Sequence, residues 1–118
     1  MPLEHAQFAK IQEDITSIQR IYALSANGRP TIGEICLIDG RFATIKAPTL
    51  LDMDFLKKIP DSAVADVAML RLCVIVDDEF LSYSSAMNIS FVDYKKFLRL
   101  IVSHLEWTKA PLLGAFKF

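Results

Sequence analysis

Two segments with the periodicity of an amphipathic helix lie near the ends of the chain, and short apolar runs separated by turn sequences lie between them. In residues 3–18, apolar side chains recur at the spacing that places them on one face of a helix. The residues on this face are Phe8, Ile11, Ile15 and Ile18. Helices that flank groups of strands predict an α+β fold.

The sequence leaves the end of the first helix open. Asn27-Gly28 followed by Pro30 can end a helix, with the glycine in the left-handed conformation. The same residues can form a type I′ turn between two strands, at residues 20–26 and 31–39. We favour the hairpin, because the first of these segments suits a strand no worse than a helix.

Two further features of a sheet surround the turn sequence Asp39-Gly40. Residues 35–38 are apolar at every position, which is typical of a central strand that is buried on both faces. The two faces of residues 41–47 differ, so we expect this strand to be partly exposed and to form an edge of the sheet. Its more polar face consists of Phe42, Thr44 and Lys46, and Ala43 and Ile45 share the other face.

The middle of the chain is predicted to contain a short helix and a second hairpin. The helix covers residues 52–58 and is ended by a proline. Residues 68–76 form a continuous apolar run, which predicts a strand buried on both faces except at Arg71. An acidic turn at residues 77–79 leads to another strand at residues 80–87, where large apolar side chains alternate with serines.

The last helix is predicted over residues 91–107, because Ser90 is a favourable N-cap and Asp93 is an acidic residue in the first turn. Leu100 and Trp107 fall almost opposite the wide apolar face of this helix. The residues of the apolar face, which we expect to pack on the sheet, are Phe91, Tyr94, Phe97, Leu98, Ile101, Val102 and Leu105. An apolar tail follows the helix.

These elements predict one α+β domain over residues 1–118, with an antiparallel sheet packed by an N-terminal, a short middle and a C-terminal helix. The 13 basic and 14 acidic residues are scattered and give a net charge of -1, which excludes a basic patch for nucleic acid or for a membrane surface. With no signal peptide or membrane-spanning run visible and two cysteines in apolar runs, we expect a cytoplasmic protein with reduced thiols.

Few residues could carry chemistry. Asp52 and Asp54 resemble a magnesium-binding pair, but their place at the start of a helix favours a role at the positive end of the helix dipole. Cys73 could act as a nucleophile if Arg71 stabilised its thiolate, but a buried thiol is favoured. We therefore expect no catalytic, metal-binding or cofactor-binding residue and no enzymatic activity.

The apolar share of 53% is high for a chain of this size, and it suggests that some apolar surface is buried by a partner or by a second copy. The tail either folds back over Leu100 and Trp107 or forms an exposed patch with them. We expect a protein partner and a homodimer, which would bury apolar side chains or add a strand to an edge. The candidate partner-binding residues are Phe42, Leu100, Trp107, Leu112, Leu113 and Phe116.

The order of the predicted elements resembles that of the class I chaperones of type III secretion and of the related YbjN-like domains. The resemblance is strongest over residues 70–107, which read as strand, acidic turn, strand, Ser90 cap and amphipathic helix. It implies a cytosolic homodimer that wraps a partially unfolded stretch of a secreted protein without a nucleotide. A Roadblock-like dimerisation module is the alternative binding class. A small hydrolase or transferase that uses Cys73 with Arg71, or Asp52 with Asp54, is the alternative enzyme class.

Overall fold

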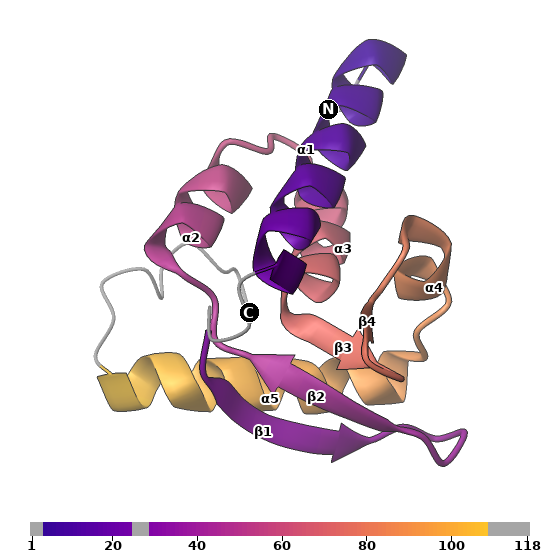
Figure 1. The fold of residues 1–118 in the computed structure, drawn as a ribbon, viewed down its shortest axis with the longest axis vertical. Coiled ribbons are helices and arrows are strands. Elements are labelled where there is room, and N and C mark those ends of the chain that lie inside the picture. Colours follow the sequence, from indigo (N-terminus) through magenta and orange to yellow (C-terminus); the bar gives the residue numbers. More distant parts are fainter. Residues whose placement is uncertain (1–3, 25–28, 109–118) are drawn as a thin grey trace.

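The computed structural model describes residues 4–24 and 29–108, which form helices packed around a four-stranded antiparallel sheet (Figure 1). The elements in chain order are α1 (His5–Leu24), β1 (Thr31–Cys36), β2 (Phe42–Lys46), α2 (Leu50–Lys57), α3 (Ser62–Cys73), β3 (Val74–Val76), β4 (Glu79–Phe80), α4 (Tyr83–Met87) and α5 (Phe91–Thr108). The strands lie in the order β1-β2-β3-β4, and each pairs antiparallel with its neighbour. The predicted fold class is confirmed.

The first helix is longer than expected. The strand prediction for residues 20–26 is wrong, because residues 20–24 belong to α1; the rest of that segment and the Asn-Gly turn lie outside the described residues. Long-range contacts stabilise the helical conformation here. Tyr22, within this segment, donates a hydrogen bond of 2.6 Å to Asp52, and the side-chain amide of Gln19, just before it, donates hydrogen bonds of 2.9 Å to the backbone oxygens of Arg71 and Leu81.

The two strands on either side of the Asp39-Gly40 turn have the opposite positions in the sheet from those predicted. The segment expected to be central, residues 35–38, contributes only its first half to β1, and β1 is an edge strand. The segment expected at an edge, residues 41–47, forms β2, which pairs with both β1 and β3. The predicted alternation is present, since Ala43 and Ile45 are fully buried. Alternation reports which face of a sheet is covered, and it carries no information on which strands pair.

The turn predicted at Asp39-Gly40 and the acidic turn predicted at residues 77–79 are present. Gly40 adopts a φ of 92°, which favours glycine, and its N–H donates to the Leu37 oxygen at 2.9 Å. Between β3 and β4 the two central residues, Asp77 and Asp78, have φ values of 54° and 65°. Positive φ at both central positions is the signature of a type I′ hairpin, and aspartate tolerates this conformation better than most residues.

The strand predicted over residues 68–76 is wrong for most of its length, because α3 extends to residue 73 and only the last three residues form β3. Asp61 is the N-cap of this helix, and its carboxylate accepts hydrogen bonds from the backbone N–H groups of Ala63 and Val64. Every residue from 68 to 73 is buried. A helix that is buried on all sides has no polar face, so its sequence resembles that of a buried strand.

The strand predicted over residues 80–87 is also wrong, since β4 ends at Phe80 and the short helix α4 follows. Ser82 caps this helix, and its hydroxyl accepts a hydrogen bond from the N–H of Ser85 at 3.1 Å. Serine side chains compete for backbone hydrogen bonds in this way, which favours helix starts over strands.

The middle and last helices are confirmed, with α2 starting two residues earlier than predicted. The Ser90 hydroxyl accepts from the N–H of Asp93 at 3.1 Å, as expected for a cap. The Asp93 carboxylate in turn accepts from the N–H of Ile38 beyond the end of β1. The start of α5 is thereby tied to the sheet.

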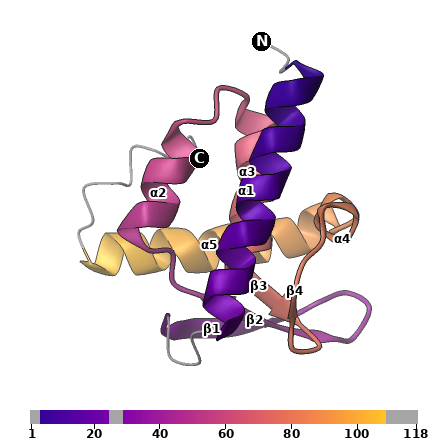
Figure 2. The ribbon, with the colours of Figure 1, turned by 45° about the horizontal axis from the view of Figure 1, so that its top comes forward.

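The hydrophobic core lies between the sheet and the helices. α5 runs across the sheet, and α1 and α3 stand side by side above it (Figures 1 and 2). Phe97 and Ile101 of α5 are almost fully buried, whereas Phe91, which the helical projection placed on the same face, is 70% exposed. No helix in the described part of the chain has the length and apolarity needed to cross a membrane.

Candidate protein-binding groove

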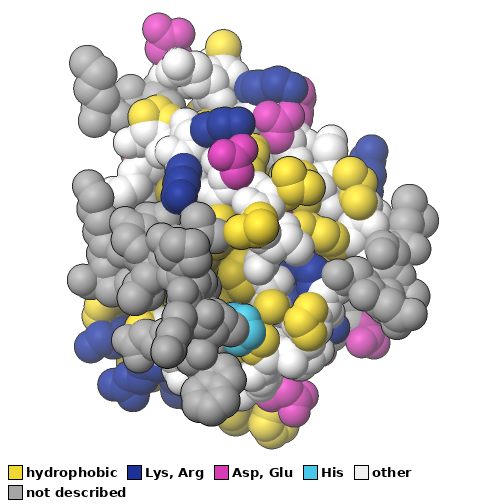
Figure 3. Space-filling model, turned by 90° about the vertical axis from the view of Figure 1, so that its left-hand side faces the viewer, with side chains coloured by type: hydrophobic (Ala, Val, Ile, Leu, Met, Phe, Trp, Pro, Cys, Tyr) yellow, Lys and Arg dark blue, Asp and Glu magenta, His cyan; other side chains and the backbone are white. Residues whose placement is uncertain are grey.

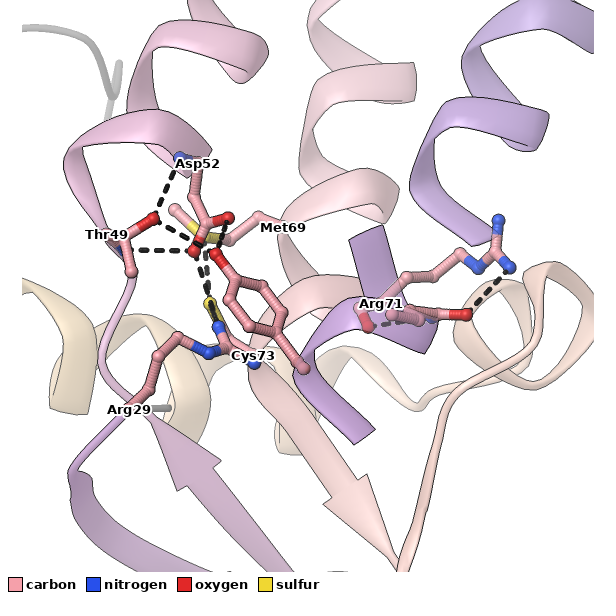
Figure 4. Close-up of polar contacts among 8 residues, drawn as sticks. Arg29, Thr49, Asp52, Met69, Arg71 and Cys73 are labelled. Carbon is pink, nitrogen blue, oxygen red and sulfur yellow. Dashed lines mark hydrogen bonds and ion pairs between the residues drawn. The ribbon is translucent and has the colours of Figure 1, made fainter. Parts of the chain in front are cut away.

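A buried pair of opposite charges lies where α1, α2 and α3 meet the sheet (Figure 4). Arg29 Nη1 lies 3.4 Å from Asp52 Oδ2, and both side chains are almost fully buried. The hydroxyl of Tyr22 donates to the other oxygen of Asp52 at 2.6 Å, and the Arg29 guanidinium stacks 3.9 Å from the centroid of the Tyr22 ring. Asp52 also forms a capping box with Thr49 at the start of α2.

This geometry separates the two carboxylates that the sequence suggested as a magnesium pair. Asp52 is 1% exposed, and its oxygens are occupied by Arg29, Tyr22 and the N–H of Thr49. Asp54 lies at the surface and pairs with Lys58 at 2.9 Å. The two carboxylates do not face a common site, and the described residues contain no cluster of three potential metal ligands.

Cys73 lies beside the same cluster, as Figure 4 shows. Its sulfur is fully buried, 3.5 Å from the sulfur of Met69 and 3.9 Å from Arg29 Nη1. Burial raises the pKa of the Cys73 thiol to about 12, against a smaller opposite effect of Arg29. The side chain is therefore a thiol at neutral pH, which does not support the alternative of a cysteine nucleophile.

We expect the two thiols to react at very different rates. Cys36 is exposed, so it should react with a chromogenic disulfide reagent within the mixing phase. Cys73 should react only as the protein opens, because its thiolate is suppressed and its sulfur is inaccessible. The measurement is thiol titration of the parent protein and of Cys36→Ser, in buffer and in denaturant. Fast labelling of folded Cys36→Ser would restore the nucleophile alternative.

Arg71 points away from Cys73 and toward α1 (Figure 4). It is buried, and its guanidinium donates to the Leu81 oxygen at 3.1 Å and to the Gln12 side-chain oxygen at 2.7 Å. Longer contacts of 3.4 and 3.5 Å reach Thr16 and Gln19. Arg71 thus connects α1, α3 and the segment after β4, and it is not placed to activate the thiol.

The candidate partner-binding residues lie in different settings. Phe42 is 63% exposed on the sheet face opposite the core, where it pairs with Cys36 across the strands. Leu100 is half-buried against Gly33 of β1, so close that a Cβ on this glycine would lie 2.9 Å from Leu100 Cδ2. Leu100 is therefore part of the packing between α5 and the sheet. The Trp107 side chain, together with Leu112, Leu113 and Phe116, lies outside the described residues.

A groove of about 360 Å³ opens between α3, α4 and the first turns of α5. At its rim Met87 is 54% exposed and Phe91 is 70% exposed. The residues that line it are Ala63, Val64, Asp66, Val67, Leu70, Tyr83, Ala86, Met87, Ile89, Phe91 and Tyr94. Most of these side chains are apolar, and the volume lies in the range of sites that take apolar groups from a ligand.

Contacts between helices hold the groove in shape. The rings of Phe8 on α1 and Tyr83 on α4 meet edge to face, with centroids 5.3 Å apart. Ser82 and Ser90 cap the two helices that form one side of the groove. The floor is formed by the buried side chains of Leu70 and Ala86. These caps determine where α4 and α5 begin, and therefore the position of the side of the groove that the two helices form.

The polar groups in the groove are Asp66 and Tyr94. Burial raises the pKa of Asp66 above its ordinary value, and a weaker opposite effect comes from the Tyr94 hydroxyl. Burial, and then the neighbouring Asp66 carboxylate, raise the pKa of Tyr94 to about 12. Asp66 is thus an exposed carboxylate on the wall of the groove, only partly shielded from water, and its polar neighbour is neutral.

A second hollow of about 540 Å³ lies between the two hairpin turns and α4. Most of its charged groups have partners: Arg41 pairs with Asp39 at 2.8 Å and with Asp77 at 3.6 Å, and Asp93 accepts from the backbone N–H of Ile38. A further apolar surface lies at the start of α2, where Leu50 and Leu51 are 76% and 80% exposed. Hydrophobic side chains gather on this side of the molecule (Figure 3).

Comparison of the chain with models of protein families, with curated proteins and with solved structures finds no match. A function is therefore inferred from the side chains of this chain alone.

Sequence reasoning did not find the groove, because it assigned strands to the segments that form α3 and α4. Asp61 and Ser82 are the signals that could have located it. Each is a good N-cap residue, and the segment that follows it contains no glycine or proline that would end a helix.

Proposed function

We propose that this chain is a non-enzymatic protein-binding module, whose groove between α3, α4 and α5 takes an apolar segment of a partner protein. The observation that carries the proposal is the exposure of Met87 and Phe91 at the rim of an apolar groove. Large apolar side chains left in water beside a concave apolar surface are typical of interaction sites. The buried thiol of Cys73 and the occupied carboxylate of Asp52 support the non-enzymatic part of the proposal.

The binding mechanism would be burial of apolar side chains by an amphipathic helix or an unfolded segment of the partner. Each side chain that becomes fully buried contributes about 1.5–3 kcal/mol, and the loss of translational and side-chain freedom on association offsets much of this gain. For a short segment that buries only a few side chains, we expect a dissociation constant of about 1–100 μM.

A homodimer and a chaperone-like role in the cytosol are part of the same proposal. Leu50 and Leu51, away from the groove, support self-association as a second apolar surface. The thiol forms of Cys36 and Cys73 fit a reducing compartment. In the structure two helices separate the two hairpins, whereas the type III secretion chaperones have three strands before a single middle helix.

The test is selection of displayed random peptides against the folded protein, followed by fluorescence anisotropy of the enriched peptides. We expect Met87→Glu to weaken binding at least about tenfold, because a charge in an apolar site costs more than about 1.4 kcal/mol unless it is paired. Ile21→Glu is the matched control: it places the same charge on an exposed apolar residue of α1 that does not line the groove, and peptide binding should not change. Leu51→Glu is measured as well, because it places the charge on the second apolar surface.

Light scattering over a dilution series accompanies these measurements and reports whether Leu51→Glu changes the mass of the protein. Failure to enrich any peptide would contradict the proposal. So would peptides whose binding is lost in Leu51→Glu and retained in Met87→Glu, since the binding surface would then be the start of α2.

A further inference from the structure

We infer that the segment bound in the groove carries a lysine or arginine beside its apolar residues, and that this cation pairs with the Asp66 carboxylate. The inference rests on the proposed function, because it names the chemistry of the partner segment that the groove takes.

The groove contains a single charge among its described lining residues, the Asp66 carboxylate. No ion pair of Asp66 with a basic side chain occurs in the described part of the chain, and its polar neighbour is the neutral Tyr94 hydroxyl. A bound apolar segment would remove more water from this carboxylate. A cation of the partner would then stabilise the Asp66 carboxylate, whereas a partner without one would bind more weakly because the carboxylate loses water without gaining an ion pair.

The shape and chemistry of the groove also suit a long cationic side chain. Three aromatic residues, Tyr83, Phe91 and Tyr94, line it beside Asp66. Aromatic faces attract ammonium and guanidinium groups. The methylene stem of lysine or arginine can cover the apolar wall while its charged end reaches the carboxylate.

One basic residue, Lys95, lies next to Phe91, outside the groove. The ammonium of Lys95 lies 5.3 Å from the centroid of the Phe91 ring. Lys95 does not line the groove, and its charge already faces an aromatic ring. An acidic residue of a partner would meet Lys95 only outside the groove and would be repelled by Asp66 inside it, so charge complementarity favours a basic residue.

The probe is an amphipathic helical peptide of roughly 16 residues with a leucine stripe and glutamine elsewhere. A panel places a single Lys, or a single Glu, in turn at each position that flanks the stripe. Dissociation constants are measured by anisotropy for the parent protein, Asp66→Asn, Asp66→Lys and Met87→Glu. Asp66 is an exposed residue and Asn has the same shape, so circular dichroism and urea unfolding should show that Asp66→Asn folds.

We expect one position at which Lys binds about 2–5-fold more tightly than Gln, the effect of an ion pair with a carboxylate that is only partly shielded from water. In Asp66→Asn the Lys and Gln peptides should bind equally at this position. In Asp66→Lys the Glu peptide should bind more tightly than the Gln peptide. Equal binding of Lys and Gln peptides at every position, or a lysine advantage that survives in Asp66→Asn, would overturn the inference while the groove remains a binding site. If no peptide binds, or if Met87→Glu binds all peptides unchanged, the proposed function fails instead.

Discussion

Replacing Asp52 with alanine should lower the free energy of unfolding by about 3–5 kcal/mol, the range measured when one partner of a buried ion pair is removed. The variant leaves the Arg29 guanidinium buried without its carboxylate. Arg29 Nη2 has no hydrogen-bond partner among the described residues in the parent protein either, so the variant leaves Arg29 with still fewer partners. It also removes the acceptor of the Tyr22 hydroxyl and half of the capping box with Thr49. The measurement is urea unfolding followed by circular dichroism.

Asp54→Ala is the matched control for this experiment. It removes the same side chain two residues along the same helix, but the ion pair of Asp54 with Lys58 is exposed and joins adjacent turns. Its loss should cost less than about 0.5 kcal/mol. Adding Arg29→Met to Asp52→Ala should recover part of the lost stability, because an apolar side chain removes the unpaired charge. Equal losses in the two single variants would contradict the role of Asp52.

Replacing Arg71 with methionine should lower the free energy of unfolding by about 2–3 kcal/mol, since hydrogen bonds to a charged donor contribute about 1.5–3 kcal/mol. Methionine keeps most of the buried volume, so the loss reports on the hydrogen bonds. The Gln12 side-chain oxygen would lose its partner, while its amide nitrogen already has none in the described chain. The Leu81 oxygen would keep only the bond from Gln19.

Arg41→Met serves as the control for Arg71→Met. Arg41 also makes several polar contacts, to Asp39 and Asp77, but its side chain is 54% exposed and its partners are in water. This change should cost less than about 1 kcal/mol. A loss for Arg71→Met no larger than that for Arg41→Met would mean that the buried contacts of Arg71 are replaced by water in the folded protein.

The parts of the fold that could be predicted from the sequence are those determined by local chemistry. Ser90 with Asp93 locates the start of α5, and a wide apolar face makes the rest of this helix recognisable. The acidic turn between β3 and β4 and the turn at Gly40 follow from residues that tolerate positive φ. Alternation along β2 identified its buried residues, Ala43 and Ile45.

The wrong predictions concern elements whose conformation depends on tertiary contacts. α3 is buried over its last six residues, so the sequence carries no polar face to distinguish it from a strand. The end of α1 is compatible with either conformation by propensity, and contacts from Gln19 and Tyr22 to distant residues select the helix. The groove could not be anticipated, because it requires α3 and α4 to be helices before Asp66 and Met87 can share a surface.

The sequence by itself determined the class of the fold, the position of its turns and its last helix, since caps, positive-φ residues and amphipathic periodicity act within a few residues of each other. Only the tertiary structure decided that Asp52 is buried with Arg29 whereas Asp54 is in water, that Arg71 faces α1 and not Cys73, and that β1 is an edge strand. The physical reason is that burial and pairing depend on residues distant in the chain, and burial sets the pKa of Cys73 and the free energy of each buried charge.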